Sequence, residues 1–234
     1  MAAKVYLIPT TLHDDATALH ALPSYLLAAV QDCQVFFVEN EKTTRRFFKK
    51  LWREMVIDNY TWHTIHKAET EVIQQFRAAI QAGNNIGIVS EAGCPAIADP
   101  GQILVAEAQQ LHATVHPLVG PSSILLALMG SGLNGQQFQF LGYLPIEATQ
   151  RKKAIKEAEL YAKQKQCTQI CIETPYRNNA FAADLLQSLQ PTTRLCIAAD
   201  LTAPTQYIVT KTVAEWKRNN LPELHKRPCI FLWL

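Results

Sequence analysis

The chain has 234 residues, a formal net charge of +2, 48% hydrophobic residues and 18% charged residues. This composition is typical of a folded soluble protein and leaves room for one large or two small domains. The net charge is too small to indicate a nucleic-acid partner, so such a partner has to be argued from local clusters. The first apolar run ends at Pro9, far short of the ~20 residues that span a bilayer, so we expect a cytoplasmic protein without a signal peptide or membrane anchor.

The cysteines indicate neither a zinc site nor disulfide bonds. They are scattered, mostly within apolar runs, and the sequence has no Cys-x-x-Cys pair and no histidine cluster at metal spacing. We therefore expect reduced core thiols and no metal. The six cysteines are Cys33, Cys94, Cys167, Cys171, Cys196 and Cys229.

Strand-like and helix-like segments alternate through the first half of the chain. Short apolar runs predict strands at 5–8, 35–38, 86–89 and 114–118. Helical patterns are found at 22–31, 41–53, 69–82 and 103–111. This alternation is typical of βαβ units and predicts a parallel sheet.

The helix predicted at 41–53 carries a cluster of basic residues. Helical spacing places five cations on one side: Lys42, Arg45, Arg46, Lys49 and Arg53. The other side is formed by Thr44, Phe48, Leu51 and Met55. The basic side is either the solvated face of an amphipathic helix or an electrostatic footprint for a phosphate-bearing substrate.

The strand predicted at 86–89 leads into a loop of small residues that extends to Gly101. This loop contains two carboxylates, Glu91 and Asp99, and two prolines. In an open α/β sheet, ligands bind just beyond the carboxyl ends of strands, so the loop resembles the floor of a ligand site. The alternative is a strand-to-helix turn that binds nothing.

A second small-residue loop follows the strand predicted at 114–118. Ser122 or Ser123 can cap the apolar helix expected at 124–129, and the free N–H groups of that helix could bind a carboxylate or a polar ring edge. A capping serine without a ligand is the alternative.

The second half of the chain has shorter units and predicts a mixed sheet with antiparallel strands. Strands are expected at 138–141, 169–173, 194–199, 207–210 and 228–234. Helices are expected at 147–165, with a solvent-facing surface, and at 181–189. We therefore predict an N-terminal α/β domain, residues 1–117, and a C-terminal α/β domain, residues 118–234.

Residues 90–101, Ser-Glu-Ala-Gly-Cys-Pro-Ala-Ile-Ala-Asp-Pro-Gly, resemble the Ser-Asp-Ala-Gly-Thr-Pro-x-Ile-Ser-Asp-Pro-Gly signature of the tetrapyrrole methylase superfamily. The version is that of the enzymes that methylate ribose 2′-oxygens in small-subunit ribosomal RNA. Four further segments resemble motifs of this family and occur in the family's order along the chain: 38–46, 120–133, 140–145 and 173–177. The resemblance covers essentially the whole chain.

The resemblance implies a two-domain tetrapyrrole-methylase-like α/β fold, with a parallel sheet in the N-terminal domain and a mixed sheet in the C-terminal domain. It also implies that S-adenosylmethionine binds in the cleft between the domains. Members of the family usually form homodimers, so the resemblance implies a homodimer as well. The positions that match the family's cofactor contacts are Thr10, Ser90, Glu91, Cys94, Ser122, Ser123, Ile172 and Ala199.

The chain departs from the family pattern at several positions. The loop after the first strand, Pro9-Thr-Thr-Leu-His-Asp-Asp15, has no glycine, and Ala203 stands where the family has a lysine. The family's aspartate and threonine in the signature are Glu91 and Cys94 here. We expect cofactor binding to survive these changes more readily than the identity of the substrate does.

The resemblance favours a methyltransferase that transfers the methyl group of S-adenosylmethionine to ribosomal RNA, at a ribose 2′-oxygen, in the small ribosomal subunit. Glu39, Lys42 and Glu173 match the family's remaining motifs and are candidates for the base, or else form structural ion pairs. A methylase of a small tetrapyrrole-like macrocycle is one alternative, against which the basic helix argues. A binding protein that holds S-adenosylmethionine without turnover is another.

Overall fold

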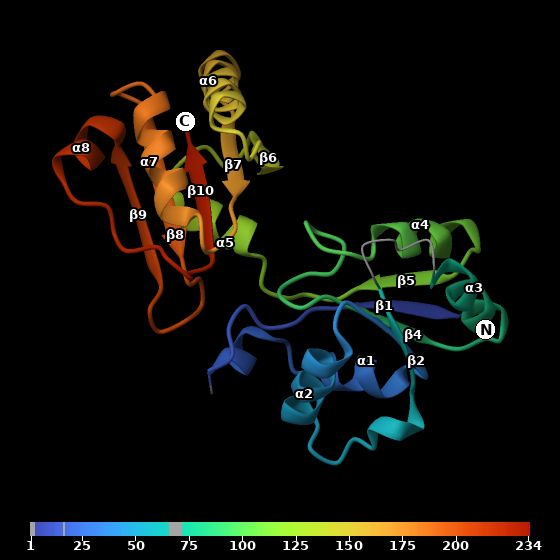
Figure 1. Cartoon of the computed structure of the whole chain (residues 1–234). Helices are drawn as coiled ribbons and strands as arrows, with labels where there is room; N and C mark the ends of the chain where they lie inside the picture. Colours follow the sequence, from blue (N-terminus) through green and yellow to red (C-terminus); the bar gives the residue numbers. More distant parts are fainter. Residues whose placement is uncertain (1–2, 16, 66–71) are drawn as a thin grey trace. The chain divides into compact units, whose positions relative to one another are not determined.

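The structure is a computed structural model that describes residues 3–15, 17–65 and 72–234 (Figure 1). The chain forms two compact units, Met1–Ser122 and Ser123–Leu234. The sequence prediction placed the boundary earlier, between residues 117 and 118. Each unit is considered by itself, and the first three residues of the helix predicted at 69–82 lie outside the described residues.

Unit 1 is built on a five-stranded sheet with the order β3-β2-β4-β1-β5. All four strand pairings are parallel, which confirms the predicted parallel sheet. Every residue of β2 and β4 is buried, which explains why both strands are nearly continuous apolar runs in the sequence. The strands are β1 (Lys4–Ile8), β2 (Val35–Val38), β3 (Thr61–Thr64), β4 (Ile86–Val89) and β5 (Thr114–Pro117).

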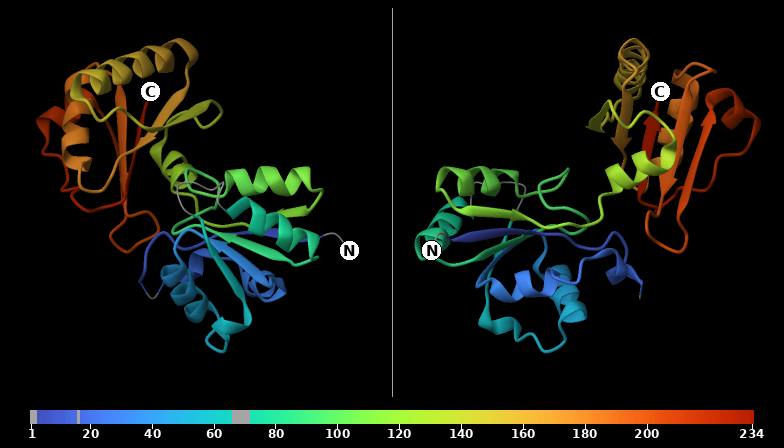
Figure 2. Two further views of the ribbon diagram at one scale, coloured as in Figure 1. Left: turned by 45° about the vertical axis from the view of Figure 1, so that its right-hand side comes forward. Right: turned by 180° about the vertical axis from the view of Figure 1, so that it is seen from behind.

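Helices cover both faces of this sheet (Figure 2). Phe76 and Leu104 pack with Phe37 and Ile88 on one face, and Phe48 packs with its neighbours on the other. The helices of the first face are α3 (Ile73–Gln81) and α4 (Gln102–Gln110), and those of the second are α1 (Leu26–Asp32) and α2 (Glu41–Leu51). The described part of unit 1 also contains the short 3₁₀ helices η1 (Ala18–Ala21) and η2 (Ile57–Asn59). Apolar side chains are therefore packed on both faces of the sheet. The loops at the strand ends are not covered by these helices and can form a site.

Two predictions for unit 1 were wrong. The first helix was expected from residue 22, but α1 begins at Leu26, because Pro23 starts a separate turn in which its carbonyl accepts the Leu26 N–H at 3.1 Å. No strand was predicted at 61–64, where the edge strand β3 lies. Its Thr-Trp-His-Thr sequence is only partly buried, so it lacks the apolar run that marked β2 and β4.

Unit 2 contains a five-stranded sheet with the order β6-β7-β10-β8-β9. β6 and β7 are parallel and the other three pairings are antiparallel, which confirms the predicted mixed sheet. The strands are β6 (Phe138–Tyr143), β7 (Thr168–Ile172), β8 (Arg194–Ala199), β9 (Tyr207–Thr212) and β10 (Cys229–Trp233).

The core of unit 2 is rich in aromatic residues, including Phe181, Trp216, Phe231 and Trp233. The helix predicted to face solvent also buries one side, including Ile155. The helices are α5 (Ser123–Ser131), α6 (Ala148–Lys165), α7 (Asn178–Ser188) and α8 (Val213–Arg218). The short helix α8 was not predicted, although Thr212 and Glu215 form a capping box at its start.

The cysteines agree with the expectation of reduced thiols. All six are free, and five are buried, whereas Cys94 lies half-buried in the loop after β4. None of the described helices is long and apolar enough to cross a membrane.

Candidate functional site

Three loops of unit 1 meet at the carboxyl end of its sheet. They follow β1, β2 and β4, and the sheet order places β4 between the other two strands. The Thr10 N–H, after β1, donates to the Gly93 carbonyl at 2.8 Å. The Glu91 N–H, after β4, donates to the Glu39 carboxylate after β2 at 2.9 Å. The small-residue loop predicted to be a ligand floor therefore lies at the centre of this group.

A fourth segment, after β5, packs on the same loops. The Cys94 thiol lies 3.7 Å from the Gly120 carbonyl and 3.6 Å from the Pro121 carbonyl. Gly120 is required here, because a Cβ atom at this position would lie 2.1 Å from the Cβ of Pro9. The absence of a side chain lets the segments after β1 and β5 approach each other closely.

The loop after β4 has an unusual backbone. Gly93 and Gly101 adopt positive φ angles of 74° and 123°, and so do two alanines, Ala96 at 66° and Ala98 at 61°. A non-glycine residue in this region costs on the order of 1–3 kcal/mol, and such residues gather at ligand sites. The Ala96 N–H donates to the Pro100 carbonyl at 3.2 Å, which helps to hold the shape. The loop is thus a shaped element that the surrounding fold maintains.

Three carboxylates gather beside this loop: Glu39, Glu91 and Asp99. The pKa of Asp99 is raised to about 6, mainly by burial and also by the charge of Glu39, while a hydrogen bond from Ser90 opposes the rise. Among the described residues, none of the three carboxylates forms an ion pair with a lysine or arginine. This local excess of negative charge favours a ligand that brings a positive group.

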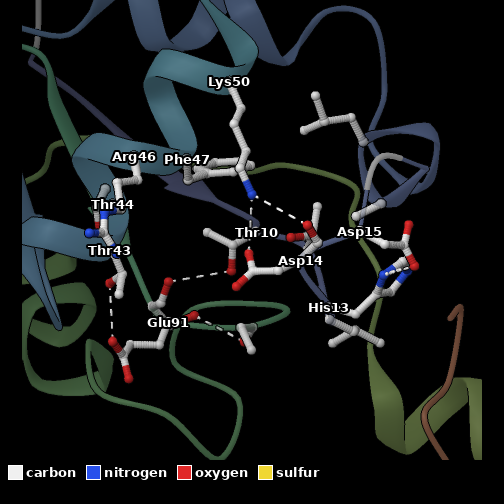
Figure 3. Close-up of a pocket in the computed structure, with 16 residues that line it drawn as sticks. Thr10, His13, Asp14, Asp15, Thr43, Thr44, Arg46, Phe47, Lys50 and Glu91 are labelled. Atoms are coloured by element: carbon white, nitrogen blue, oxygen red, sulfur yellow. Dashed lines mark hydrogen bonds and ion pairs between the residues drawn. The ribbon is translucent and has the colours of Figure 1, made fainter.

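A cavity of about 530 Å³ opens next to the loop (Figure 3). One wall comes from the segment after β1, a second wall from α2, and the remaining side from Ser90, Glu91 and Ala92. The residues that line the first two walls are Thr10, Thr11, Leu12, His13, Asp14, Asp15, Ala18, Leu19, Thr43, Thr44, Arg46, Phe47 and Lys50. The cavity is large enough for part of a nucleotide and lies wholly within unit 1.

The structure divides the cations of α2 into two groups. Arg46 and Lys50 line the cavity, and Lys50 lies 3.4 Å from Asp14. Arg45 instead pairs with Glu41, and its guanidinium lies 5.1 Å from the centre of the Trp62 ring. Lys49 also makes structural contacts, because its ammonium group donates to the carbonyls of residues 53 and 55 at 2.6 and 2.8 Å. Arg45, Arg46, Lys49 and Lys50 do surround one shallow hollow of the surface. Arg45 and Lys49 are also engaged in holding α2, so the predicted basic face is not one set of equally available charges.

The candidates for the base lie in different surroundings. The Glu39 carboxylate accepts the N–H of Glu91 and faces the loop after β4. Lys42 is exposed in the first turn of α2, and Arg53 lies beyond the end of that helix. Glu173 is buried in unit 2 and accepts a hydrogen bond from Arg177 at 2.6 Å. This contact is the structural ion pair that the sequence analysis gave as the alternative to a catalytic role. The catalytic roles of Glu39, Lys42 and Glu173 stay predictions.

The predicted cofactor contacts fall into two sets. Thr10, Ser90, Glu91, Cys94 and Ser122 all lie in unit 1, in the loops that follow β1, β4 and β5. The other set is in unit 2. Here Ser123 opens α5, while Ile172 and Ala199 end β7 and β8 on either side of β10. Their role in cofactor binding stays a prediction.

Several residues of the site were not predicted. Asp99 was expected in the floor of the site but not among the cofactor contacts, and Lys50 was left out of the basic face. His13 and Asp15 lie in the segment without glycine, and the His13 Nδ1 is 2.7 Å from the Asp15 carboxylate. A histidine two residues before an aspartate is too common a pattern to signal a site by itself.

Comparison with known proteins identifies the family. The family described as Tetrapyrrole (Corrin/Porphyrin) Methylases matches residues 21–217. A protein of Micromonospora olivasterospora named "Ribosomal RNA small subunit methyltransferase I" is 30% identical over 97% of this chain and 66% of its own length. The protein of the same name from Vibrio cholerae is 30% identical over 92% of this chain and 70% of its own length. The chain therefore spans about two thirds of these relatives, and slightly less of the first.

Solved structures agree on the fold. The crystal structure of the methyltransferase CobJ matches with a TM-score of 0.61 and 13% identity, over 99% of this chain and 93% of that one. The uroporphyrin-III-C-methyltransferase from Thermus thermophilus matches with a TM-score of 0.55 and 14% identity, over 100% of this chain and 92% of that one. The fold and the resemblance predicted from the sequence are thereby confirmed. By its sequence signature, its two α/β units and these matches, the chain belongs to the tetrapyrrole methylase family.

Proposed function

We propose that this protein is an S-adenosylmethionine-dependent methyltransferase that methylates small-subunit ribosomal RNA at a ribose 2′-oxygen. The names of its relatives support an RNA acceptor in the small ribosomal subunit. The observation that carries the proposal is the cavity in unit 1, which is lined by Glu91 on one side and by Arg46 and Lys50 of α2 on another. Such a cavity suits a cationic methyl donor next to an anionic acceptor.

The chemistry of the loop after β4 fits the methyl donor. Glu91 and Asp99 would accept hydrogen bonds from its ammonium group, and the buried Ser90 would support Asp99. The donor supplies a sulfonium methyl group, whose carbon is open to attack by a nucleophile. The contribution of the protein is to align the nucleophile with that carbon, and alignment can supply several kcal/mol of the barrier reduction.

The cations of α2 fit an RNA acceptor. Arg46 is exposed, lines the cavity and forms no hydrogen bond or ion pair with another described residue. Lys50 has only the weak contact with Asp14, whose side chain is 99% exposed. Both side chains can therefore contact phosphate groups at little cost to the fold.

Binding and transfer assays test the activity. Isothermal titration with S-adenosylmethionine should show saturable binding, and tritium from the labelled methyl group should enter small ribosomal subunits or their RNA. Binding without transfer to any RNA fraction would support the non-catalytic alternative. Transfer to a tetrapyrrole but not to RNA would support the small-macrocycle alternative.

The salt dependence of RNA binding tests the acceptor. The double variant Arg46→Gln, Lys50→Gln should flatten the slope of log affinity against log salt by up to about two, because each phosphate contact adds somewhat under one unit. The matched double variant Arg45→Gln, Lys49→Gln removes the same charge from the cations that hold α2 and should leave the slope nearly unchanged. Equal slopes for the two double variants would refute a specific role of the cavity rim.

We further propose that the protein is a cytoplasmic homodimer. The family resemblance supports the dimer, and a ribosomal substrate supports the location. Analytical ultracentrifugation should give twice the mass of the chain, and the mass of a single chain at micromolar concentration would refute the dimer.

A further inference from the structure

We propose that His13, which lies next to Asp15, is the base that accepts the proton of the acceptor hydroxyl. This inference rests on the proposed methyl transfer to a ribose. An unactivated hydroxyl is a weak nucleophile, and an adjacent base that removes its proton raises its reactivity. The relevant question is therefore which described side chain of the cavity can act as a base at neutral pH.

His13 has the required position. It lies in the segment after β1 and lines the cavity together with Ser90 and Glu91 (Figure 3). Its side chain is 14% exposed, so the ring is held by its surroundings and still reaches the cavity. Among the described residues that line this cavity, His13 is the single histidine. An imidazole is the side chain whose ordinary pKa lies nearest to neutral pH.

The carboxylate of Asp15 lies next to the ring. This carboxylate lies 2.7 Å from the His13 Nδ1 and accepts hydrogen bonds from the Thr17 N–H at 2.8 Å and the Thr17 hydroxyl at 2.6 Å. The hydroxyl of Thr17 is the main reason why the pKa of Asp15 lies below its ordinary value. The contact is electrostatic, because Nδ1 forms no hydrogen bond among the described residues. The negative charge of Asp15 favours a proton on the nearer ring nitrogen, Nδ1, which leaves the lone pair of Nε2 free.

Other charges around the cavity come from each of its walls. The segment after β1 also carries Asp14, α2 contributes Arg46 and Lys50, and the loop after β4 contributes Glu91. The cavity that His13 lines therefore carries charges of both signs.

The earlier candidates are less suited to this role. Glu39 already accepts the Glu91 N–H, and Glu173 is held by Arg177 in unit 2. Lys42 is exposed in the first turn of α2 and does not line the cavity. His13 is free of these commitments.

The step balances as a single displacement. Nε2 of His13 takes the proton of the ribose hydroxyl while the hydroxyl oxygen forms its bond to the methyl carbon. The bond between that carbon and sulfur breaks, and its electron pair stays on the sulfur. The products are the methylated ribose, S-adenosylhomocysteine and a protonated His13, which returns its proton to solvent.

The test compares His13→Gln with His20→Gln, a histidine substitution in η1 that is exposed and does not line the cavity. Under single-turnover conditions with small ribosomal subunits, His13→Gln should lower the transfer rate by a factor on the order of 10²–10⁴. Affinities for S-adenosylmethionine and for RNA should change less than about threefold, by titration of each. The rise of the wild-type rate with pH near neutrality should disappear in His13→Gln and persist in His20→Gln.

A second readout does not depend on activity. The imidazole resonance that is missing in His13→Gln identifies His13 in the proton NMR spectrum of the wild-type protein. Asp15→Asn should change the chemical shift of that resonance, because it removes the charge of the carboxylate that lies 2.7 Å from Nδ1. An unchanged His13 resonance in Asp15→Asn, or a wild-type transfer rate in His13→Gln, would overturn the proposal. If the wild-type protein transfers no methyl group to any RNA, the proposed function fails and the catalytic role of His13 fails with it.

Discussion

The loops after β4 and β7 each place a glutamate at the carboxyl end of a buried strand, yet the two carboxylates have opposite surroundings. In unit 2, the Glu173 side chain is 3% exposed, and Arg177 donates to it at 2.6 and 3.1 Å. In unit 1, Glu91 is exposed and accepts a hydrogen bond from the Thr43 hydroxyl at 3.0 Å. One carboxylate is paired within its own loop, whereas the other lies with Glu39 and Asp99 in a group without a cation.

The difference shows how a structural carboxylate can be told from one that is available to a ligand. A buried ion pair keeps the charge of Glu173 neutralised in every state of the protein, so this residue has little to offer a substrate. The carboxylates of Glu39, Glu91 and Asp99 repel one another, and other interactions in unit 1 have to offset this repulsion. We interpret that uncompensated repulsion as the mark of the site.

Removing the cation of the paired loop should have the largest effect. Arg177→Ala leaves the buried Glu173 without a counterion and should lower the free energy of unfolding by about 3–5 kcal/mol. Urea denaturation monitored by circular dichroism measures this change. Arg194→Ala, an exposed arginine that starts β8, is the control and should change it by less than about 0.5 kcal/mol. A loss below 1 kcal/mol for Arg177→Ala would mean that the two loops differ less than the geometry indicates.

A smaller effect is expected where the loops of unit 1 pack together. In Gly120→Ala, the new Cβ atom would meet Pro9, and the overpacking should cost roughly 1–3 kcal/mol of stability. Because Gly120 supports Cys94, affinity for S-adenosylmethionine should fall as well. Gly135→Ala has open space around its Cβ atom and should leave both quantities nearly unchanged. Equal melting temperatures for the two variants would show that the close approach to Pro9 is not needed.

The smallest expected effect concerns pH. The pKa of Asp99, about 6, is above the model-compound value of 3.8, so folding favours its protonated form. Its charge therefore costs nothing below pH 4, becomes destabilising between pH 4 and 6, and keeps that cost at higher pH. Asp99→Asn should match the wild type at pH 4 and be more stable at pH 7.5, by on the order of 1 kcal/mol after solvent screening, or ~2–4 °C in Tm. A difference that is the same at both pH values would show that burial and repulsion do not raise the pKa of Asp99.

The strands were the most predictable part of the fold. The predicted ranges 35–38, 86–89 and 194–199 coincide with β2, β4 and β8, because strands buried on both faces leave apolar runs with sharp ends. The edge strand β3 and the short helix α8 were missed. Both are held in place largely by neighbours that are distant in the sequence, and tertiary packing of that kind leaves a weak local pattern.

The missed strand also explains the error in the basic helix. Helical spacing alone could not separate Arg45 from Arg46, which are neighbours in the sequence. What separates them is Trp62 on β3, which provides a ring for the Arg45 guanidinium while Arg46 lines the cavity. Without β3, the partner of Arg45 could not be predicted.

The site was predictable only in part, for a related reason. The loop after β4 is local, so its small residues and its carboxylates could be recognised in one stretch of sequence. The cavity depends on three segments that approach in space, and the contact between His13 and Asp15 depends on how the segment after β1 turns. The raised pKa of Asp99 likewise depends on packing in space, because its main cause is burial and its second is the charge of Glu39 on another loop.

The central claim is that the carboxylates after β4 form a ligand site, in contrast to Glu173. The most direct test is isothermal titration of S-adenosylmethionine against Glu91→Ala, with Glu157→Ala as the control. Glu157 is exposed on α6 in unit 2 and contacts Lys153 only at 3.9 Å. Both variants lose one exposed carboxylate, so they change the overall charge equally.

The account predicts that Glu91→Ala weakens binding by about tenfold to a hundredfold, because a hydrogen bond to a charged group contributes roughly 1.5–3 kcal/mol. Glu157→Ala should keep the wild-type dissociation constant. A folded Glu91→Ala variant with wild-type affinity would contradict the account and would remove Glu91 from the site.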